Sequence, residues 1–253
     1  MPSVRLESLI SMAEMELRRL KHDPFEILTR AVQPILWIAV FGSVMARIRA
    51  FPSVGDYITF ITPGVILQSS TFISLAYGIA LIFERESGIL KKLLTSPIPR
   101  SYIVIGRALA GGIRASTQYI IVLVLGVLVG AKISNNILNL ITGYLILVLA
   151  CMGFTGLSIL IASLLRTRER FMGIIGAITM PLFFASNALY PVEVMPDVIK
   201  YISLVNPLTY TVSALRKLLV SNSYDILQEV LILTCFTVLA LGISIKNLRR
   251  IIE

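Results

Sequence analysis

The chain has 253 residues, of which 56% are apolar, and its mean hydropathy is +0.85. This apolar share is above that of ordinary soluble domains and indicates an integral membrane protein. Its 23 lysines and arginines outnumber 14 aspartates and glutamates, which gives a net charge of +9. Two cysteines and one histidine leave no basis for a disulfide framework or a zinc site.

Charge-free runs predict an all-α fold in which one domain, residues 1–253, crosses the membrane six times. A helix needs about 17 to 25 residues to cross the hydrocarbon. The run 133–165 is too long for one span and too short for two, so we assign its polar start, around Ser134, to a turn. The predicted spans lie near residues 31–46, 57–83, 115–131, 138–164, 171–192 and 230–245.

The basic residues gather in the segments that an even number of spans would place on one side of the membrane. That side would hold both termini and the connections between spans two and three and between spans four and five. The positive-inside rule makes it cytoplasmic, so we expect a multi-pass protein of the cell (plasma) membrane with both termini in the cytoplasm. The net charge is then explained by topology and by attraction to the lipid bilayer, and we expect no nucleic-acid partner.

Residues 1–24 predict an amphipathic helix at the cytoplasmic interface. Leu6, Ile10 and Leu17 recur at helical spacing, charged residues occupy the rest of the wheel, and Pro24 ends the pattern. The helix would lie on the membrane surface or pack on a cytoplasmic partner, and both interpretations stay open. Its charges argue against a cleaved secretory signal. Residues 25–253 would form the six-helix bundle.

A charged, helix-competent segment, residues 83–97, separates the second and third predicted spans. Acidic residues come first, an apolar and basic turn follows, and Ser96 and Pro97 end the segment. This is the pattern that a short docking helix for a cytoplasmic partner needs. We refer to residues 83–97 as the charged segment.

Three arginines follow the charged segment at a spacing of seven residues: Arg100, Arg107 and Arg114. They share one face of the helix that becomes the third span. A buried cation is costly in a membrane, so we place this face at the inner edge of the bilayer. Pairing with Glu84 or Glu86 is favoured over contact with a substrate.

Small and polar residues inside the predicted spans admit two interpretations. Gly126 and Gly130 in span three, and Gly173 and Ala177 in span five, would allow close helix packing within one subunit or between two subunits. A set of polar residues in span two could line a route for a polar head group, although interhelical hydrogen bonding is the commoner use. The candidates for a substrate path in this set are Gln68, Ser70 and Ser74.

The region between the fifth and sixth spans contains three prolines, Pro191, Pro196 and Pro207, among short apolar pieces. Each proline removes a backbone donor and interrupts a helix, so a seventh span is excluded. We predict short re-entrant helices at the outer face.

The chain lacks the chemistry that would let it power transport. It contains no G-x-x-x-x-G-K-[ST] loop, so it does not bind and hydrolyse ATP in the P-loop manner. Glu26, Glu84, Glu169 and Glu229 lie at span ends, whereas a proton- or sodium-coupled carrier usually needs such a group near the midplane. Energy must come from elsewhere, or transport is passive.

These features resemble the permeases of the ABC-2 type transporter family, over nearly the whole chain. The resemblance includes Thr62-Pro63-Gly64 in span two and Asn206-Pro207-Leu208-Thr209-Tyr210 before the last span. The family's loop motif, E-x-x-x-G-T-L-E-x-L-L-x-S-P, is matched at Glu84, Gly88, Leu90, Leu93, Leu94, Ser96 and Pro97. Ile89 stands where threonine is usual, and Lys91 where an acid is usual. The chain is most similar to the small drug and antibiotic exporters.

The resemblance implies a non-catalytic subunit that works with two separately encoded P-loop ATPase subunits. ATP and Mg²⁺ would be bound by those subunits, and no cofactor is expected in this chain. A second copy of the chain, or a related permease, would complete the transporter. The charged segment would be the coupling helix inserted into the ATPase, through Glu84, Arg85, Glu86, Gly88, Leu90, Lys91, Lys92, Leu93, Leu94, Ser96 and Pro97.

The resemblance also implies a dimer interface and an outer gate. Spans one and five would form the interface, with Gly173 and Ala177 as contacts, and the N-terminal helix would contact the ATPase. The outer helices would cap the pathway, with Pro191, Pro196, Asn206 and Pro207 as the gate residues.

The expected cargo is a hydrophobic or amphipathic compound, such as a drug, a lipid or a glycolipid, because the path holds no buried charge. Trp37 is the single tryptophan, which disfavours the aromatic tunnel of a polysaccharide exporter. The alternative is a passive channel or a membrane scaffold that recruits a cytoplasmic partner through the charged segment. An intramembrane enzyme is disfavoured because no histidine or carboxylate accompanies a serine or threonine nucleophile inside a span.

Overall fold

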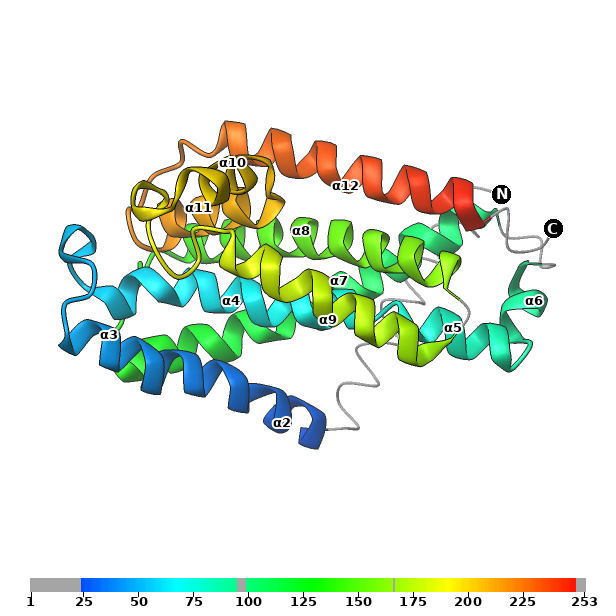
Figure 1. The fold of residues 1–253 in the computed structure, drawn as a ribbon, viewed down its shortest axis with the longest axis horizontal. Coiled ribbons are helices and arrows are strands. Elements are labelled where there is room, and N and C mark those ends of the chain that lie inside the picture. Colours follow the sequence, from blue (N-terminus) through cyan, green and yellow to red (C-terminus); the bar gives the residue numbers. More distant parts are fainter. Residues whose placement is uncertain (1–23, 95–98, 166, 249–253) are drawn as a thin grey trace.

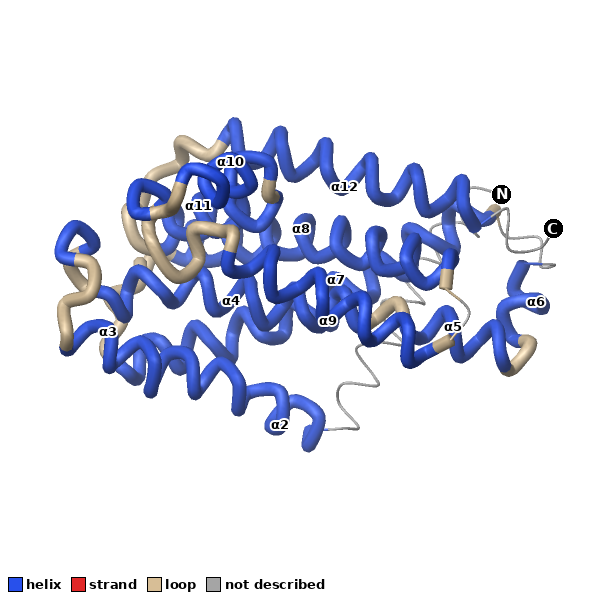
Figure 2. Tube along the Cα trace, in the orientation of Figure 1, coloured by secondary structure: helices blue, strands red, loops and turns tan. Residues whose placement is uncertain are grey.

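The computed structural model describes residues 24–94, 99–165 and 167–248. In these ranges every regular element is a helix, which confirms the all-α class for the described part of the chain (Figures 1 and 2). The N-terminal amphipathic helix predicted at residues 1–24 lies outside them, apart from Pro24. The elements are α2 (Pro24–Ile35), η1 (Leu36–Gly42), α3 (Ser43–Arg47), η2 (Pro52–Val54), α4 (Tyr57–Ala76), α5 (Ile79–Glu86), α6 (Ile89–Leu94), α7 (Arg100–Val129), α8 (Ile137–Leu164), α9 (Arg168–Phe184), η3 (Val192–Val194), α10 (Asp197–Val205), α11 (Pro207–Leu219) and α12 (Leu227–Leu248).

Five helical segments in the described residues are long and apolar enough to cross a membrane, namely Thr29–Arg47, Tyr57–Glu86, Ser101–Val129, Ile137–Leu164 and Leu227–Leu248. They correspond to predicted spans one, two, three, four and six. The second joins α4 to α5 through a turn at Tyr77 and Gly78. The first contains Pro34 and a π-helical stretch, η1.

The region predicted as the fifth span forms α9, a helix of 17 residues that is shorter than those five. Its predicted end at residue 192 is wrong, because α9 ends at Phe184. The Ser186 hydroxyl donates to the Phe183 carbonyl at 2.7 Å, and the Asn206 amide donates to the carbonyls of Leu182 and Ala185 at 2.7 and 3.2 Å. Side chains thus take over the last carbonyls of α9, and the chain turns.

The long helices lie side by side along the longest axis of the molecule, with α12 at one edge and α2 at the other (Figure 1). Their directions alternate. One end of the bundle holds α10, α11 and the connection from α3 to α4, and the opposite end holds α5, α6 and the last turn of α12 (Figure 1). The charged segment and the link from α8 to α9 therefore lie at the same end.

Helix α8 forms the centre of the bundle and packs against α12, α7, α11 and α4. It is apolar on all sides, as expected of a helix that is surrounded by others. Small residues bring α12 close: a Cβ at Gly153 would lie 2.8 Å from Thr237 Oγ1. Two hydroxyls bond across this contact, Thr237 to the Leu149 carbonyl at 3.0 Å and Ser244 to the Gly156 carbonyl at 2.6 Å.

The glycine pair predicted in span three has two separate roles. A Cβ at Gly126 would lie 2.7 Å from Thr62 Cγ2, so this glycine permits close packing of α7 on α4 within one chain. Gly130 adopts a φ of +110° and ends α7. Its role is a left-handed helix cap, for which glycine is favoured.

Candidate functional site

The described part of the charged segment, residues 83–94, is a pair of short helices with a sharp bend between them. Gly88 lies at the bend with a φ of +74°, a conformation that glycine adopts at no steric cost. Its amide donates to the Arg85 carbonyl at 3.2 Å, and the Lys92 amide donates to the Gly88 carbonyl at 3.4 Å. The motif glycine therefore ends α5 and turns the chain into α6.

The first acid of the segment, Glu84, forms an ion pair with Arg107 of α7. Both side chains are largely buried, at 26% and 12% exposure. The pairing predicted from the seven-residue spacing of the arginines is thereby confirmed for Arg107. This bond joins the end of α5 to the third long helix.

Arg85 binds the C-terminal end of α8. Its guanidinium donates to the carbonyls of Leu165, Ala162 and Ser163 at 2.8, 3.1 and 3.4 Å. The last carbonyls of a helix have no partner inside the helix and carry its negative dipole end, which a cation stabilises. The sequence does not predict that Arg85 binds the end of α8, because every residue type has a backbone carbonyl that can accept a hydrogen bond.

Glu86 pairs with Arg168, the first residue of α9. The guanidinium carbon of Arg168 also lies 3.5 Å from the centroid of the Phe83 ring, in a cation–π contact. Exposure of the two ionic side chains is 41% and 40%, so the pair adds little to stability, about 0–1 kcal/mol. It serves to hold α9 beside α5.

Three consecutive residues, Glu84, Arg85 and Glu86, therefore join α5 to three different helices, α7, α8 and α9. We call these contacts the charged clasp. A helix held by bonds in three directions moves with its neighbours as a unit. A force applied to α6 is consequently passed to the bundle at several points.

Helix α6 presents two kinds of side chain in its described positions. Leu90 is 2% exposed and packs into the chain's own core, so it anchors α6 and does not face a partner. Ile89 is 55% exposed, and Lys92 is exposed as well. The structure describes Lys91, Leu93 and Leu94 only as helical backbone, and Ser96 and Pro97 lie outside the described residues.

The candidate substrate-path residues Gln68, Ser70 and Ser74 lie inside the bundle on α4, at 3%, 0% and 0% exposure. Ser74 donates to the Ser70 carbonyl at 2.9 Å. Gln68 Oε1 and Ser70 Oγ have no hydrogen-bond partner among the described residues. Ser69, their neighbour, lines a pocket beside α2 that Gln68, Ser70 and Ser74 do not line. Their role in a substrate path stays a prediction.

The predicted interface residues Gly173 and Ala177 lie on an open face of α9. A Cβ at Gly173 would meet no atom within 4 Å, and Ala177 is exposed. Gly176 is equally open. The face is free to meet another helix, and its role as a dimer interface stays a prediction.

The predicted gate residues start helices or turns at the end of the bundle opposite the charged segment (Figure 1). Pro191 precedes η3, and Pro196 precedes α10. Asn206 caps α11 by accepting from the Leu208 amide at 3.0 Å, and Pro207 occupies the first position of that helix. Short helices therefore do occupy this region, while gating stays a prediction.

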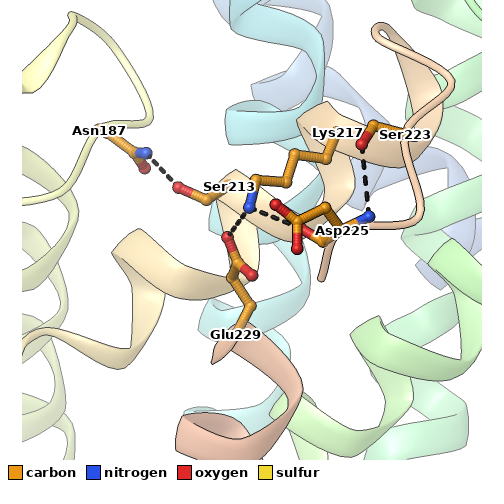
Figure 3. Close-up of polar contacts among 6 residues, drawn as sticks. All are labelled: Asn187, Ser213, Lys217, Ser223, Asp225 and Glu229. Atoms are coloured by element: carbon orange, nitrogen blue, oxygen red, sulfur yellow. Dashed lines mark hydrogen bonds and ion pairs between the residues drawn. The ribbon is translucent and has the colours of Figure 1, made fainter. Parts of the chain in front are cut away.

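A polar network connects α11 to its neighbours (Figure 3). The Asn187 amide donates to Ser213 Oγ at 2.9 Å. Lys217 lies 2.7 Å from Glu229 of α12 and donates to the Asp225 carbonyl at 2.6 Å. Glu229, an acid at the end of a predicted span, is buried at 5% exposure and has a lysine partner.

Arg216, the neighbour of Lys217, binds a carbonyl of α4, a carbonyl in the turn after α9 and one aromatic ring. It donates to Phe60 at 3.2 Å and Asn187 at 2.9 Å, and its guanidinium carbon lies 3.8 Å from the Phe60 ring centroid. Burial lowers the pKa of Arg216 to about 10, and the negative charge of Glu193 partly opposes this shift. The side chain stays charged at neutral pH and fastens α11 to α4.

Comparison with known proteins identifies this architecture. Residues 7–220 match the family model described as ABC-2 type transporter. The chain belongs to the ABC-2 type transporter family. It is 30% identical to ycf38 of Cyanophora paradoxa, whose name describes a transport permease, over 92% of this chain and 81% of that protein.

Two further ABC-2 relatives carry names that mention drugs. The daunorubicin resistance ABC transporter permease protein DrrB1 of Streptomyces coeruleorubidus is 23% identical over 79% of this chain and 70% of its own. YbhR of Escherichia coli strain K12, named as a multidrug ABC transporter permease, is 29% identical over 72% of this chain and 50% of its own. The protein is thus a multi-pass membrane permease of the ABC-2 family.

Proposed function

We propose that this chain is the transmembrane subunit of an ATP-driven exporter. Two copies, or this chain and a related permease, would pair through the open face of α9 that carries Gly173 and Ala177. Two separate P-loop ATPase subunits would bind ATP and Mg²⁺ and dock at the end of the bundle that holds α6. The cargo would be a hydrophobic or amphipathic compound that leaves the cytoplasm.

The observation that carries the proposal is the charged clasp. It joins α5, immediately before the exposed α6, to α7 and α9 by ion pairs and to the end of α8 by hydrogen bonds. A docking surface that is rigidly connected to three helices of the bundle can transmit the closure of an ATPase. A passive channel that merely recruits a partner has no need for such a connection.

The proposed topology follows from the same arrangement. The end with α5, α6 and the C-terminal end of α12 would face the cytoplasm, and the end with α10 and α11 would face outward. The N-terminal helix would be a second contact with the ATPase. Helix α9 would complete six spans, because about 17 residues are enough to cross the hydrocarbon.

The experiment that tests the proposal is purification of the tagged chain from native membranes, followed by an ATPase assay of the complex. Ile89→Asp places a charge on the exposed face of α6, and Val198→Asp makes the same change on α10, where Val198 is 73% exposed. An ATPase should co-purify with the unaltered chain and with Val198→Asp and should be lost with Ile89→Asp. A chain that purifies alone would overturn the proposal and favour a channel or scaffold.

A further inference from the structure

Two adjoining pockets open beside α2, with volumes of about 240 and 290 Å³. Arg30, Ile73 and Ala76 line both of them, so the two pockets form one cleft. We call it the α2 cleft. Its walls come from α2, α4, α5, α7 and α9, and its total size falls in the range of about 300–1,000 Å³ that is typical of small-molecule sites.

The first pocket contains a buried polar side chain with no partner. Gln118 of α7 is 0% exposed, and neither its amide oxygen nor its amide nitrogen has a hydrogen-bond partner among the described residues. An amide that is buried without a partner is costly, and a ligand that hydrogen-bonds to it recovers that cost. Ser69 and Gln33 line the same pocket and add further polar groups.

Two arginines line the α2 cleft. Arg30 lines both pockets, and Arg114 lines the second. None of the described residues that line the cleft is an aspartate or a glutamate. Both arginines also interact with other groups in the chain, but a guanidinium carries five N–H donors and can bind an anion at the same time.

The remaining walls are apolar and partly exposed. Phe72 in the first pocket is 41% exposed, and Phe83 and Met172 in the second are 44% and 43% exposed. In a bilayer Phe72, in the middle of the second span, would lie against hydrocarbon, whereas the Phe83 ring also contacts the Arg168 guanidinium. The α2 cleft therefore combines two cations, an unpartnered amide and an apolar border that continues to the lipid.

We propose that the α2 cleft binds an anionic amphiphile. Its phosphate or carboxylate head group lies between Arg30 and Arg114, its polar linker bonds to the Gln118 amide, and its apolar chain lies along Phe72. The ligand is a phospholipid of the bilayer or a cargo of the transporter. Binding itself does not depend on ATP-driven export, whereas the assignment to cargo rests on the proposed function.

Native mass spectrometry of the purified full chain tests the proposal, with phosphatidylglycerol and phosphatidylcholine of the same acyl chains as probes. Phosphatidylglycerol should bind about tenfold more tightly, because only its head group carries a net negative charge. Arg30→Gln and Arg114→Gln should each remove most of this difference. Gln118→Leu, which replaces an unpaired amide by an apolar side chain of similar size, should weaken the binding of both lipids.

Matched controls lie elsewhere in the chain. Arg47→Gln removes an exposed arginine at the other end of the first span, and Thr155→Val removes a buried, unpartnered hydroxyl on α8 that does not line the cleft. Both should bind phosphatidylglycerol like the unaltered chain. Equal binding of the two lipids, or unchanged binding in both arginine variants, would overturn the proposal.

Cross-linking to the unaltered chain tests the site even if the variants fail to fold. A photoreactive phosphatidylglycerol should form cross-links that map to α2, α4 and α7 around the cleft, and cross-links confined to other helices would refute the site. Proteoliposomes that contain the ATPase partner separate the two sources of ligand. ATP-dependent movement of fluorescent phosphatidylglycerol, lost in Gln118→Leu, identifies the site as a cargo site, and binding without movement identifies a resident lipid.

Discussion

Arg168 opens α9 with its guanidinium carbon 3.5 Å from the centroid of the Phe83 ring, while it pairs with Glu86 of α5. One side chain thus contacts α5 twice. Because both ionic groups are about 40% exposed, the contact contributes little to the stability of the fold.

Reversal of that pair tests the charged clasp. Glu86→Arg and Arg168→Glu should each lower cargo-coupled ATP hydrolysis several-fold, because like charges then face each other, and the double reversal should restore most of it. Thermal unfolding temperatures should change by no more than about 4 °C, as expected for an exposed pair. Arg170→Glu, an exposed change on the same helix turn, is the control. A double variant no better than the single variants would show that the pair does not transmit motion.

Arg85 should contribute more to stability than either exposed partner. Its three acceptors are partly buried carbonyls, and hydrogen bonds to a charged group are worth about 1.5–3 kcal/mol. We expect Arg85→Met to lower the stability of the purified chain by about 2 kcal/mol, and Arg85→Lys by less. Thermal unfolding in detergent, with Arg47→Met as the control, measures the difference. Equal stability of Arg85→Met and Arg47→Met would contradict the cap on α8.

Substitutions of Gly88 should be tolerated in the order in which the new residues adopt a positive φ. Alanine in this conformation costs about 1–2 kcal/mol, and asparagine costs less because it adopts left-handed conformations more readily. A Cβ at Gly88 would meet no atom within 4 Å, so a steric clash does not contribute to the cost of substitution. Gly88→Ala should reduce coupled ATP hydrolysis, and Gly88→Asn should retain more of it. The same activity in both variants would mean that the angle between α5 and α6 is unimportant.

The sequence predicts the long helices well, because charge-free runs of sufficient length have few alternatives in a membrane protein. It also predicts the pairing of Arg107 with Glu84, since a spacing of seven residues places the arginines on one face. It fails at the end of α9, where the Asn206 amide, 24 and 21 residues away, takes the carbonyls of Leu182 and Ala185. Contacts of this kind depend on tertiary structure.

In the candidate site, too, the sequence predicts some features and only the structure shows others. Gly88 is recognisable from the motif, but the reason for it is a φ of +74° that only the structure shows. Leu90 belongs to the same motif and turns out to be buried in the core, while its exposed neighbour Ile89 occupies a position where the chain departs from the motif. The sequence does not predict that Arg85 binds the carbonyls of α8 or that the Gln118 amide is buried without a partner, because neither backbone acceptors nor missing partners can be inferred from residue spacing.

The open face of α9 gives a direct test of dimer formation. Gly173→Leu adds volume where no atom lies within 4 Å, so the isolated chain should fold normally, but two such chains should no longer pair closely. Gly126→Leu is the contrast, because its Cβ would lie 2.7 Å from Thr62 Cγ2 and should destabilise the chain itself. Light scattering after size-exclusion chromatography should show a monomer for Gly173→Leu and poor recovery for Gly126→Leu. A stable dimer of Gly173→Leu would move the interface to another face.

The ion pair between Lys217 and Glu229 joins a buried carboxylate to a lysine side chain that is 36% exposed, in contrast to the pair of Arg168, in which both partners are exposed (Figure 3). The Glu229 side chain is 7% exposed, so removal of Lys217 leaves its charge buried and unpaired. Such a loss costs about 3–5 kcal/mol in a fully buried pair and less here, because Lys217 is partly exposed, whereas replacement of both partners by apolar residues is often nearly neutral. Lys217→Met should therefore unfold at a clearly lower temperature than the double variant Lys217→Met/Glu229→Leu. If the double variant is the less stable of the two, the carboxylate has partners beyond Lys217, and α12 is held to α11 by a wider network than this single pair.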